Sequence, residues 1–230
     1  MDLNVIYEDN HIIVVNKPPM VLSQGDGTGD PDMLSCVKEY IRKKYSKPGN
    51  VYAGLVHRLD RPVGGVMVFA KTSKAASRLS EQIRNDGFIK EYCAVIHGEP
   101  ERQGVFEDWL VRDPLYNNTR PAAKDVPGAK YARLEYKVKR TVEGLSEVRI
   151  LLLTGRHHQI RVQFASRGFP LFGDVRYGDP LEKGGIALYA CRLSFMHPVR
   201  KEELSFEADP PWNIEKFIDM SKDRNKRDIR

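Results

Sequence analysis

Short apolar runs separated by turn-forming residues dominate the chain and predict strands. Two runs, 131–142 and 145–153, alternate between apolar and polar residues and are joined by Glu143-Gly144. This pattern is typical of a β-hairpin, with Val148, Ile150 and Leu152 on one face of its second strand. The other expected strands are shorter and lie at 5–7, 12–15, 66–70, 92–96, 187–189 and 204–206.

Near-helical spacing of apolar residues predicts two helices in the first half of the chain. Asp30-Pro31 predicts an N-cap followed by a proline in the first turn, and the helix should run to about Tyr45. Thr72 or Ser73 should cap the second helix, which ends at Asn85-Asp86-Gly87.

The second half of the chain predicts two more helices and one irregular stretch. The spacing of Ile160 with Phe164 indicates a short helix over 158–166, and a terminal helix should begin near Trp212. Residues 97–130, which include Pro114, Pro121 and Pro127, are expected to be a loop-rich connection between the halves of the molecule. Hairpins and separated helices together predict an α+β fold with a mixed, mainly antiparallel sheet.

The length of 230 residues fits one large domain, or two closely fused subdomains, with enough apolar residues (41%) for a core. No apolar run approaches the roughly 20 residues that span a bilayer. The acidic start of the chain does not resemble a secretory signal, so a cytoplasmic protein is expected. The cysteines, Cys36, Cys93 and Cys191, are far apart and are expected to be reduced thiols and not metal ligands.

The net charge of +6 favours a polyanionic partner. Residues 151–173 contain three arginines and two histidines but no acid. Residues 221–230 hold five Lys or Arg against two Asp and predict a flexible basic tail after a main domain of residues 1–220. Loose contact with phosphates is the alternative function of this tail.

One loop concentrates charge in a way that suggests chemistry: His57-Arg58-Leu59-Asp60-Arg61-Pro62. Neighbouring guanidinium groups favour the ionised form of Asp60, which could then act as a nucleophile or a base. A structural ion pair that fixes the loop explains the same charges equally simply. The charge pattern alone leaves both readings open.

The same loop, followed by Gly65, resembles the signature of the RluA-type RNA pseudouridine synthases, and further segments resemble other parts of that family in the same order. Together they cover about residues 4–211. These segments are Val5 to Asn10, Val15-Asn16-Lys17-Pro18, Phe69-Ala70-Lys71-Thr72, Lys90-Glu91-Tyr92 with Ala94 and Gly98, Thr154 to Arg161, Gly173-Asp174 with Tyr177-Gly178, and Leu188 to Pro198.

The resemblance implies a fold with a central RNA-binding cleft and a catalytic role for Asp60. In the family this carboxylate attacks the target uridine, so that the glycosidic bond breaks and the base rejoins the ribose through carbon. Tyr92 matches the active-site tyrosine that stacks on the base, and Arg161 matches the basic residue paired with the aspartate. The alternatives are a core tyrosine on a strand and a solvated arginine.

Further residues are expected to contact RNA. The resemblance suggests that Arg58 helps to extrude the uridine from its stack, which costs a few kcal/mol. The other expected contacts are His57, Arg61, Arg156, His157 and His158. Two positions depart from the family pattern: Gly64 replaces a small hydroxyl residue, and His157 stands where Thr or Pro is more usual.

These observations predict a cofactor-free and metal-free RNA pseudouridine synthase, since no Gly-rich phosphate loop or metal-ligand cluster is found. The expected partner is RNA, with large-subunit ribosomal RNA before transfer RNA, and a monomer is expected. No S4-type RNA-binding domain precedes the match, so the catalytic domain should supply the RNA contacts. A non-catalytic RNA-binding protein would lack the set of Asp60, Tyr92 and Arg161. A hydrolase using His57 or His158 would need a second carboxylate or a nucleophile motif.

Overall fold

The computed structural model describes residues 2–182 and 184–227. The chain divides into two compact units, which are described separately below. Unit 1 consists of Met1–Lys90 and Ala190–Asp209, and unit 2 consists of Glu91–Tyr189 and Pro210–Arg230.

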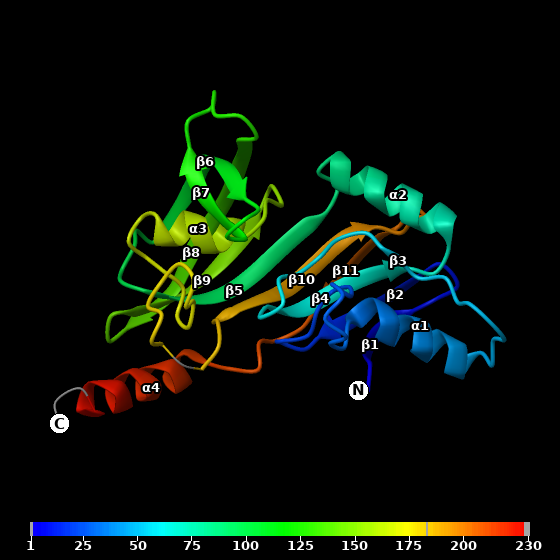
Figure 1. The fold of residues 1–230 in the computed structure, drawn as a ribbon, viewed down its shortest axis with the longest axis horizontal. Coiled ribbons are helices and arrows are strands. Elements are labelled where there is room, and N and C mark those ends of the chain that lie inside the picture. Colours follow the sequence, from blue (N-terminus) through cyan, green and yellow to red (C-terminus); the bar gives the residue numbers. More distant parts are fainter. Residues whose placement is uncertain (1, 183, 228–230) are drawn as a thin grey trace. The chain divides into compact units, whose positions relative to one another are not determined.

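Unit 1 is built on strands in the order β1-β2-β4-β10, with β3 also paired to β4 and β11 to β10 (Figure 1). The pairs β1–β2, β2–β4, β3–β4 and β10–β11 are antiparallel. Its strands are β1 (Asn4–Glu8), β2 (Ile12–Lys17), β3 (Gly54–Leu55), β4 (Gly64–Ala70), β10 (Leu188–Met196, the first two residues of which belong to unit 2) and β11 (Glu203–Glu207). Its helices are α1 (Met33–Lys44) and α2 (Ser73–Arg84).

The core of unit 1 is formed by β2 and β4, whose register pairs Ile12 with Ala70 and Lys17 with Gly65. Every residue of β4 is buried, so both of its faces are covered. Helix α2 packs against β4, and Leu79 is fully buried in the shared apolar cluster. Because β2 and β4 are rigid and buried, the loops at their ends start from fixed positions.

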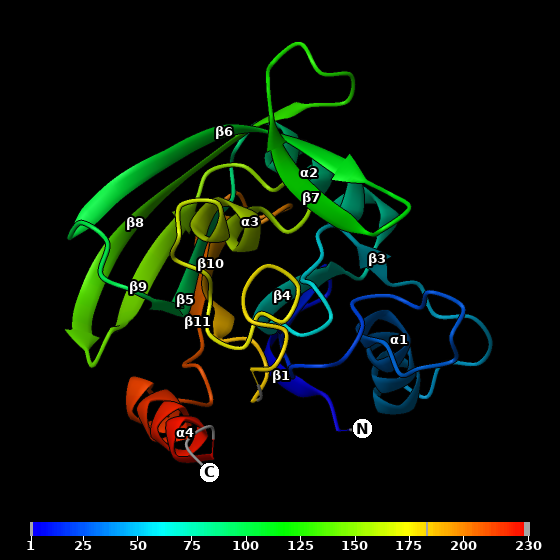
Figure 2. The same ribbon diagram turned by 60° about the vertical axis from the view of Figure 1, so that its left-hand side comes forward.

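Unit 2 contains a second antiparallel array in the order β5-β9-β8-β6-β7 (Figure 2). Its strands are β5 (Ile89–His97, which begins in unit 1), β6 (Gln103–Asp113), β7 (Asn118–Ala122), β8 (Lys130–Val142) and β9 (Leu145–Leu152). Its helices are α3 (Gln159–Ala165) and α4 (Ile214–Arg227).

The predicted hairpin of residues 131–153 is confirmed as β8 and β9. Glu143 and Gly144 form its turn with φ of 50° and 75°, as a two-residue turn with positive φ at both positions requires. Val148, Ile150 and Leu152 are all buried on one face. Phe164 of α3 is fully buried and packs edge-on against Tyr136 of β8, so this face carries the core of unit 2.

The α+β prediction with a mainly antiparallel sheet is confirmed. No helix among residues 2–182 and 184–227 is long and apolar enough to cross a membrane. The prediction that 221–230 form a flexible tail stays a prediction: α4 extends to Arg227, and residues 228–230 lie outside the described residues.

The predicted N-cap at Asp30 is wrong, because Asp32 caps α1. The carboxylate of Asp32 accepts a hydrogen bond from the Ser35 backbone N–H at 3.0 Å, whereas Asp30 pairs with Arg61 at 2.8 Å. Both aspartates precede the apolar periodicity, and the pattern alone did not distinguish them. The caps of α2 were predicted well, with Thr72 at its N-terminus and Asn85 at its C-terminus.

The predicted loop-rich connection over 97–130 is also wrong, since it contains β6 and β7. Pro114 lies in the tip that joins the two strands, where a turn is required. Pro121 of β7 pairs with Leu110 of β6, and β7 is the last strand in the order of unit 2. An edge strand tolerates a proline because it has an unpaired side. Pro114 therefore lies in a turn and Pro121 on an edge strand, and both are compatible with a hairpin.

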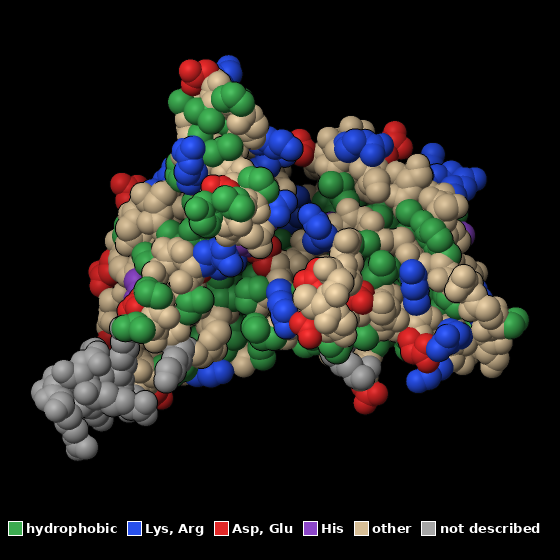
Figure 3. Space-filling model, viewed as in Figure 1, with side chains coloured by type: hydrophobic (Ala, Val, Ile, Leu, Met, Phe, Trp, Pro, Cys, Tyr) green, Lys and Arg blue, Asp and Glu red, His purple; other side chains and the backbone are tan. Residues whose placement is uncertain are grey.

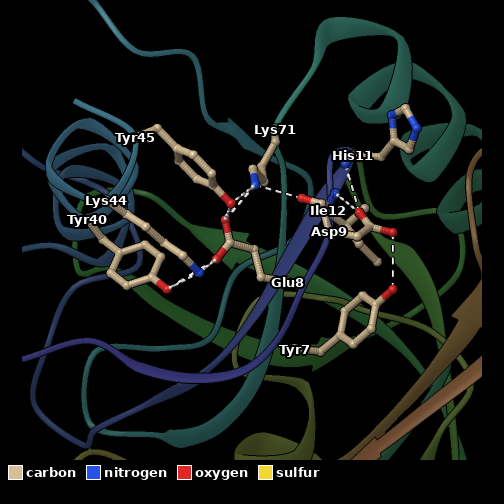
Figure 4. Close-up of polar contacts among 9 residues, drawn as sticks. All are labelled: Tyr7, Glu8, Asp9, His11, Ile12, Tyr40, Lys44, Tyr45 and Lys71. Atoms are coloured by element: carbon tan, nitrogen blue, oxygen red, sulfur yellow. Dashed lines mark hydrogen bonds and ion pairs between the residues drawn. The ribbon is translucent and has the colours of Figure 1, made fainter. Parts of the chain in front are cut away.

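A buried carboxylate, Glu8 at the end of β1, connects α1 to the sheet of unit 1 (Figure 4). Its oxygens accept hydrogen bonds from Lys44 at 2.6 Å, Tyr45 at 2.9 Å and Tyr40 at 3.1 Å, and they pair with Lys71. Burial raises the pKa of Glu8, but the bonds from Lys44, Lys71 and Tyr45 outweigh this and lower the pKa to about 2.

Replacing Glu8 by Gln should therefore destabilise unit 1 at neutral pH by about 2 kcal/mol, because Lys71 loses its partner in a buried site. A lowered carboxyl pKa adds stability above the unfolded pKa of about 4.3, and this stability is lost as the pH falls towards 2. The difference between wild type and variant in urea unfolding should thus shrink between about pH 4.5 and pH 2. Glu39→Gln, in an exposed ion pair with Arg42, is the control and should change little. An equal effect of both variants at pH 7 would contradict the prediction.

Candidate active site

The loop that carries Asp60 lies in unit 1 between β3 and β4, and two backbone contacts hold it. The Ser23 hydroxyl donates to the Leu59 carbonyl at 2.7 Å and accepts from the Leu59 N–H at 3.1 Å. The Asp60 carbonyl accepts from the Val63 N–H at 3.0 Å, which closes a tight turn. Leu59 and Val63 are buried, so the backbone on both sides of Asp60 is anchored in the core.

Lys17 places a buried positive charge next to this loop. It ends β2, has no exposed surface, and donates from Nζ to the carbonyls of Pro18 and Arg61, each at 3.1 Å. Burial lowers the pKa of Lys17 to about 8, while the negative charge of Asp60 acts to raise it. The attraction is mutual, so the ammonium of Lys17 favours the ionised form of Asp60. This is the charge state that a nucleophilic or basic carboxylate requires.

The backbone at position 65, directly after the loop, lies so close to the backbone of Ala190 that only glycine fits. Its φ is 127°, and a Cβ atom at this position would lie 2.2 Å from the carbonyl oxygen of Ala190 on β10. No side chain fits there. The glycine that ends the signature loop therefore lets β4 and β10 approach closely at the point where the loop returns to the sheet.

The other polar side chains of this loop have different surroundings. The His57 ring accepts a hydrogen bond from the Val68 N–H at 3.1 Å and packs against Phe88. Burial, with a smaller effect of Lys90, lowers the pKa of His57 to about 4, so the ring is neutral at pH 7. Arg58 is exposed, and Arg61 forms an exposed pair with Asp30. The expected RNA contacts of these three residues stay predictions.

Arg161 lies in unit 2 on α3 and is held by a buried carboxylate. Its Nε and Nη2 donate to the two oxygens of Asp174 at 2.8 and 2.7 Å, and its guanidinium lies 5.2 Å from the ring centre of Tyr177. Arg161 is only 6% exposed, so the alternative of a solvated arginine is wrong. Ile160 and Phe164 are buried as predicted.

Asp174 is itself fixed by the backbone that follows it. One of its oxygens also accepts from the N–H groups of Arg176 at 3.1 Å and Tyr177 at 3.2 Å. Gly173, with φ of 72°, leads into this turn, and a Cβ atom there would lie 2.0 Å from the carbonyl oxygen of Gly185. The carboxylate that orients Arg161 is thus fixed by the hydrogen bonds of its own turn.

The two histidines before α3 belong to the same network of unit 2. Their rings stack at 3.7 Å. Nδ1 of His158 lies 2.9 Å from the Tyr177 hydroxyl, and Nδ1 of His157 lies 2.8 Å from the Thr119 hydroxyl of β7. Burial, followed by the nearby charge of Arg161, lowers the pKa of His158 to about 2, so this ring is neutral.

His157 and His158 precede the helix that carries Arg161 and do not share a helix face with it. Helix α3 begins only at Gln159, and His158 adopts a left-handed conformation with φ of 51° at its N-cap. The structure nevertheless connects the three residues through Tyr177, which contacts both His158 and Arg161. Arg156, the other predicted RNA contact here, is exposed, and its Nε donates to the Tyr131 carbonyl at 2.7 Å.

Tyr92 is 8% exposed on β5, where it pairs with Ile150 of β9. The three predicted catalytic residues are thus divided between the units, with Asp60 in unit 1 and Tyr92 and Arg161 in unit 2. Among residues 2–182 and 184–227, no group of three or more His, Cys, Asp or Glu side chains is placed to hold a metal ion.

Comparison with known proteins identifies the family. Residues 11–166 match the family model described as RNA pseudouridylate synthase. A ribosomal large subunit pseudouridine synthase D from Zymomonas mobilis is 31% identical over 230 residues, which cover 95% of this chain and 72% of the relative. The Vibrio cholerae protein of the same name is 35% identical, with 92% of this chain and 68% of the relative covered. The chain belongs to the RNA pseudouridylate synthase family.

The solved structures agree on the fold of this RNA pseudouridine synthase. Human RNA pseudouridylate synthase domain containing 4 superposes with a TM-score of 0.76 at 21% identity, and covers 90% of this chain and 88% of its own. Human RNA pseudouridylate synthase domain containing 1 gives a TM-score of 0.73 at 20% identity, with 93% and 86% covered. The prediction of an isomerase that converts uridine in RNA to pseudouridine is confirmed at the level of the family.

Sequence reasoning gave no role to two residues of the synthase that the structure makes prominent. Lys17 ends the strand Ile12–Lys17, whose first four residues are apolar, and a lysine inside a buried strand is rare enough to be a signal of its own. Asp174 was part of the family resemblance, but its pairing with Arg161 spans thirteen residues and no periodicity indicates it.

Replacing Asp174 by Asn should destabilise the synthase by about 3–5 kcal/mol, because Arg161 would keep its charge in a buried site without a compensating carboxylate. Denaturant unfolding measures this change. Glu107→Gln removes an exposed partner of Arg133 in the same unit and should cost less than about 1 kcal/mol. Equal unfolding midpoints for the two variants would show that the Arg161–Asp174 pair does not stabilise unit 2.

Proposed function

We propose that the synthase isomerises one or more uridines of large-subunit ribosomal RNA, with Asp60 as the catalytic carboxylate. The observation that carries the assignment of Asp60 is the buried ammonium of Lys17 beside it, since a structural ion pair on an exposed loop needs no such charge. The choice of RNA is supported by the relatives named for the large ribosomal subunit.

The reaction exchanges one bond of the uridine for another. The bond between N1 of the base and C1′ of the ribose breaks, and a bond between C5 and C1′ forms. The proton on C5 is lost, and N1 gains one, so atoms and charge balance without an oxidant or a reductant. An anchored carboxylate that is kept ionised suits the first step, in which it attacks the uridine.

Tyr92 and Arg161 complete the proposed catalytic set on the strength of the family motifs. Tyr92 would stack on the base, and its hydroxyl would assist removal of the C5 proton. Arg161 would supply positive charge for the carboxylate chemistry. Its rigid pairing with Asp174 supports this role, because an oriented guanidinium loses little freedom when it binds.

A cytoplasmic location and a monomeric state belong with this proposal. The location follows from the substrate, because ribosomal RNA is made and assembled in the cytoplasm of bacteria, from which the relatives above come. The monomer is an expectation from the family resemblance, and sedimentation of the purified chain measures it directly.

Pseudouridine mapping of total RNA tests the function directly. Deletion of the gene should remove pseudouridine from at least one position of large-subunit ribosomal RNA, and wild type should restore it. Asp60→Ala should fail to restore it, with a rate at least about 10³-fold lower in vitro, because the reaction loses its nucleophile. If deletion instead removes a pseudouridine from transfer RNA, transfer RNA is the substrate. If Asp60→Ala restores the missing pseudouridine, Asp60 is not the catalytic carboxylate.

Charge and hydrogen bonding at Lys17 can be separated with two substitutions. Lys17→Met removes both, whereas Lys17→Gln removes the charge and keeps an N–H donor for the Arg61 carbonyl. Both should move the acidic limb of the pH–rate profile to higher pH, because Asp60 loses a favourable charge. Only Lys17→Met should also lower the unfolding midpoint strongly, since the carbonyls of Pro18 and Arg61 lose their donor. An unchanged acidic limb in both variants would show that Lys17 is purely structural.

A further inference from the structure

The tip of the β6–β7 hairpin in unit 2 presents two adjacent apolar side chains to solvent. Residues 114–117 join the paired strand ends Asp113 and Asn118. In this tip Leu115 is 81% exposed and Tyr116 is 67% exposed. Single exposed apolar residues are ordinary, but here two occur together at the end of a long hairpin. Neither contributes its apolar surface to the core.

The backbone of this tip is nevertheless held in one conformation. The Asp113 carboxylate accepts from the N–H groups of Leu115 at 2.9 Å and Tyr116 at 3.3 Å. The Arg176 guanidinium donates to the carbonyls of Tyr116 at 2.9 Å and Asn117 at 3.2 Å. The tip is therefore ordered before a partner arrives, so binding loses little conformational entropy.

The base of the hairpin is tied to the segment that holds Arg161. The Tyr177 hydroxyl accepts from the Thr119 N–H at 2.8 Å, and the Thr119 hydroxyl lies 2.8 Å from His157. Tyr177 also lies over the Arg161 guanidinium. A ligand held at the tip would thus be held at a fixed distance from Arg161 within unit 2.

Positive charge surrounds the tip. Arg112 and Arg120 lie on the two strands beside it, Arg176 lies on the loop that contacts it, and all three are exposed. The acid closest in sequence, Asp113, is already used by the backbone of the tip. Figure 3 shows Lys and Arg side chains over the part of this face that β6, β7 and α3 form. Such a surface attracts phosphates and disfavours a basic or neutral protein partner.

We propose that Tyr116, with Leu115 beside it, is a stacking platform for an unpaired base of the RNA substrate, while the surrounding arginines hold the adjacent phosphates. An exposed aromatic ring between basic side chains is suited to a splayed base, because every base has a flat face to stack. The inference rests on the proposed function only for the identity of the RNA. It assigns part of the substrate selectivity to the hairpin tip, separate from the catalytic residues.

Binding of an unmodified transcript of bacterial large-subunit ribosomal RNA tests the proposal, with Asp60→Ala in every variant to prevent turnover. Tyr116→Ala should raise Kd about 5-fold or more, which is the size of a lost base stack. Tyr116→Phe keeps the ring and should stay within about twofold. Leu181→Ala, at a residue 73% exposed elsewhere in unit 2, is the matched control and should have no effect. Arg120→Gln should reduce the slope of log K against log salt by about one.

The outcomes separate this inference from the proposed function. Equal Kd values for Tyr116→Ala and Leu181→Ala would overturn the stacking platform even if wild type forms pseudouridine. If the variants show the predicted Kd values but the wild-type enzyme forms no pseudouridine, the stacking platform would be supported and the proposed reaction refuted. If Tyr116→Ala weakened binding only to ribosomal particles and not to naked RNA, the tip would contact a protein and the proposal would be wrong.

Discussion

The buried ammonium of Lys17 is the constraint on which the candidate active site in unit 1 depends. Burying a lysine completely costs free energy unless its charge and its N–H groups find partners. The carbonyls of Pro18 and Arg61 and the charge of Asp60 are those partners. If the loop moved, Lys17 would lose its hydrogen bond to the Arg61 carbonyl and the neighbouring charge of Asp60. The same contact fixes the position of the loop and favours the ionised form of its carboxylate.

Unit 2 contains a similar buried pair, but here the proposed catalytic residue is the cation and its partner is the carboxylate. Arg161 is fixed by the buried carboxylate of Asp174, and Asp174 is fixed by backbone N–H groups of its own turn. Each predicted catalytic charge thus has a buried partner of opposite sign supplied by a distant segment. Such a pair adds little net stability over an apolar pair of equal size, so geometry is the better explanation for its presence.

The sequence predicted what depends on local pattern and missed what depends on distant pairing. The β8–β9 hairpin and the caps of α2 follow from alternation and from single residues such as Thr72. The pattern does not predict the β6–β7 hairpin, because Pro114 and Pro121 indicate a loop, although a hairpin tip and an edge strand accept prolines. The roles of Lys17 and Asp174 come from contacts across 44 and 13 residues, which no window of sequence reveals.

Catalysis and recognition place opposite demands on side chains, and the residues that we propose for the two tasks differ accordingly. A catalytic charge must be oriented and shielded from water, and Arg161, which we propose for this role, is buried and paired. A group that selects RNA must be reachable before the substrate is bound, and Tyr116, which we propose for this role, is exposed on a hydrogen-bonded backbone. The bonds of Thr119 to Tyr177 and His157 join the two kinds of residue within unit 2. Substitutions at the tip should therefore change which RNA binds, whereas substitutions at the buried charges should change the rate and the stability.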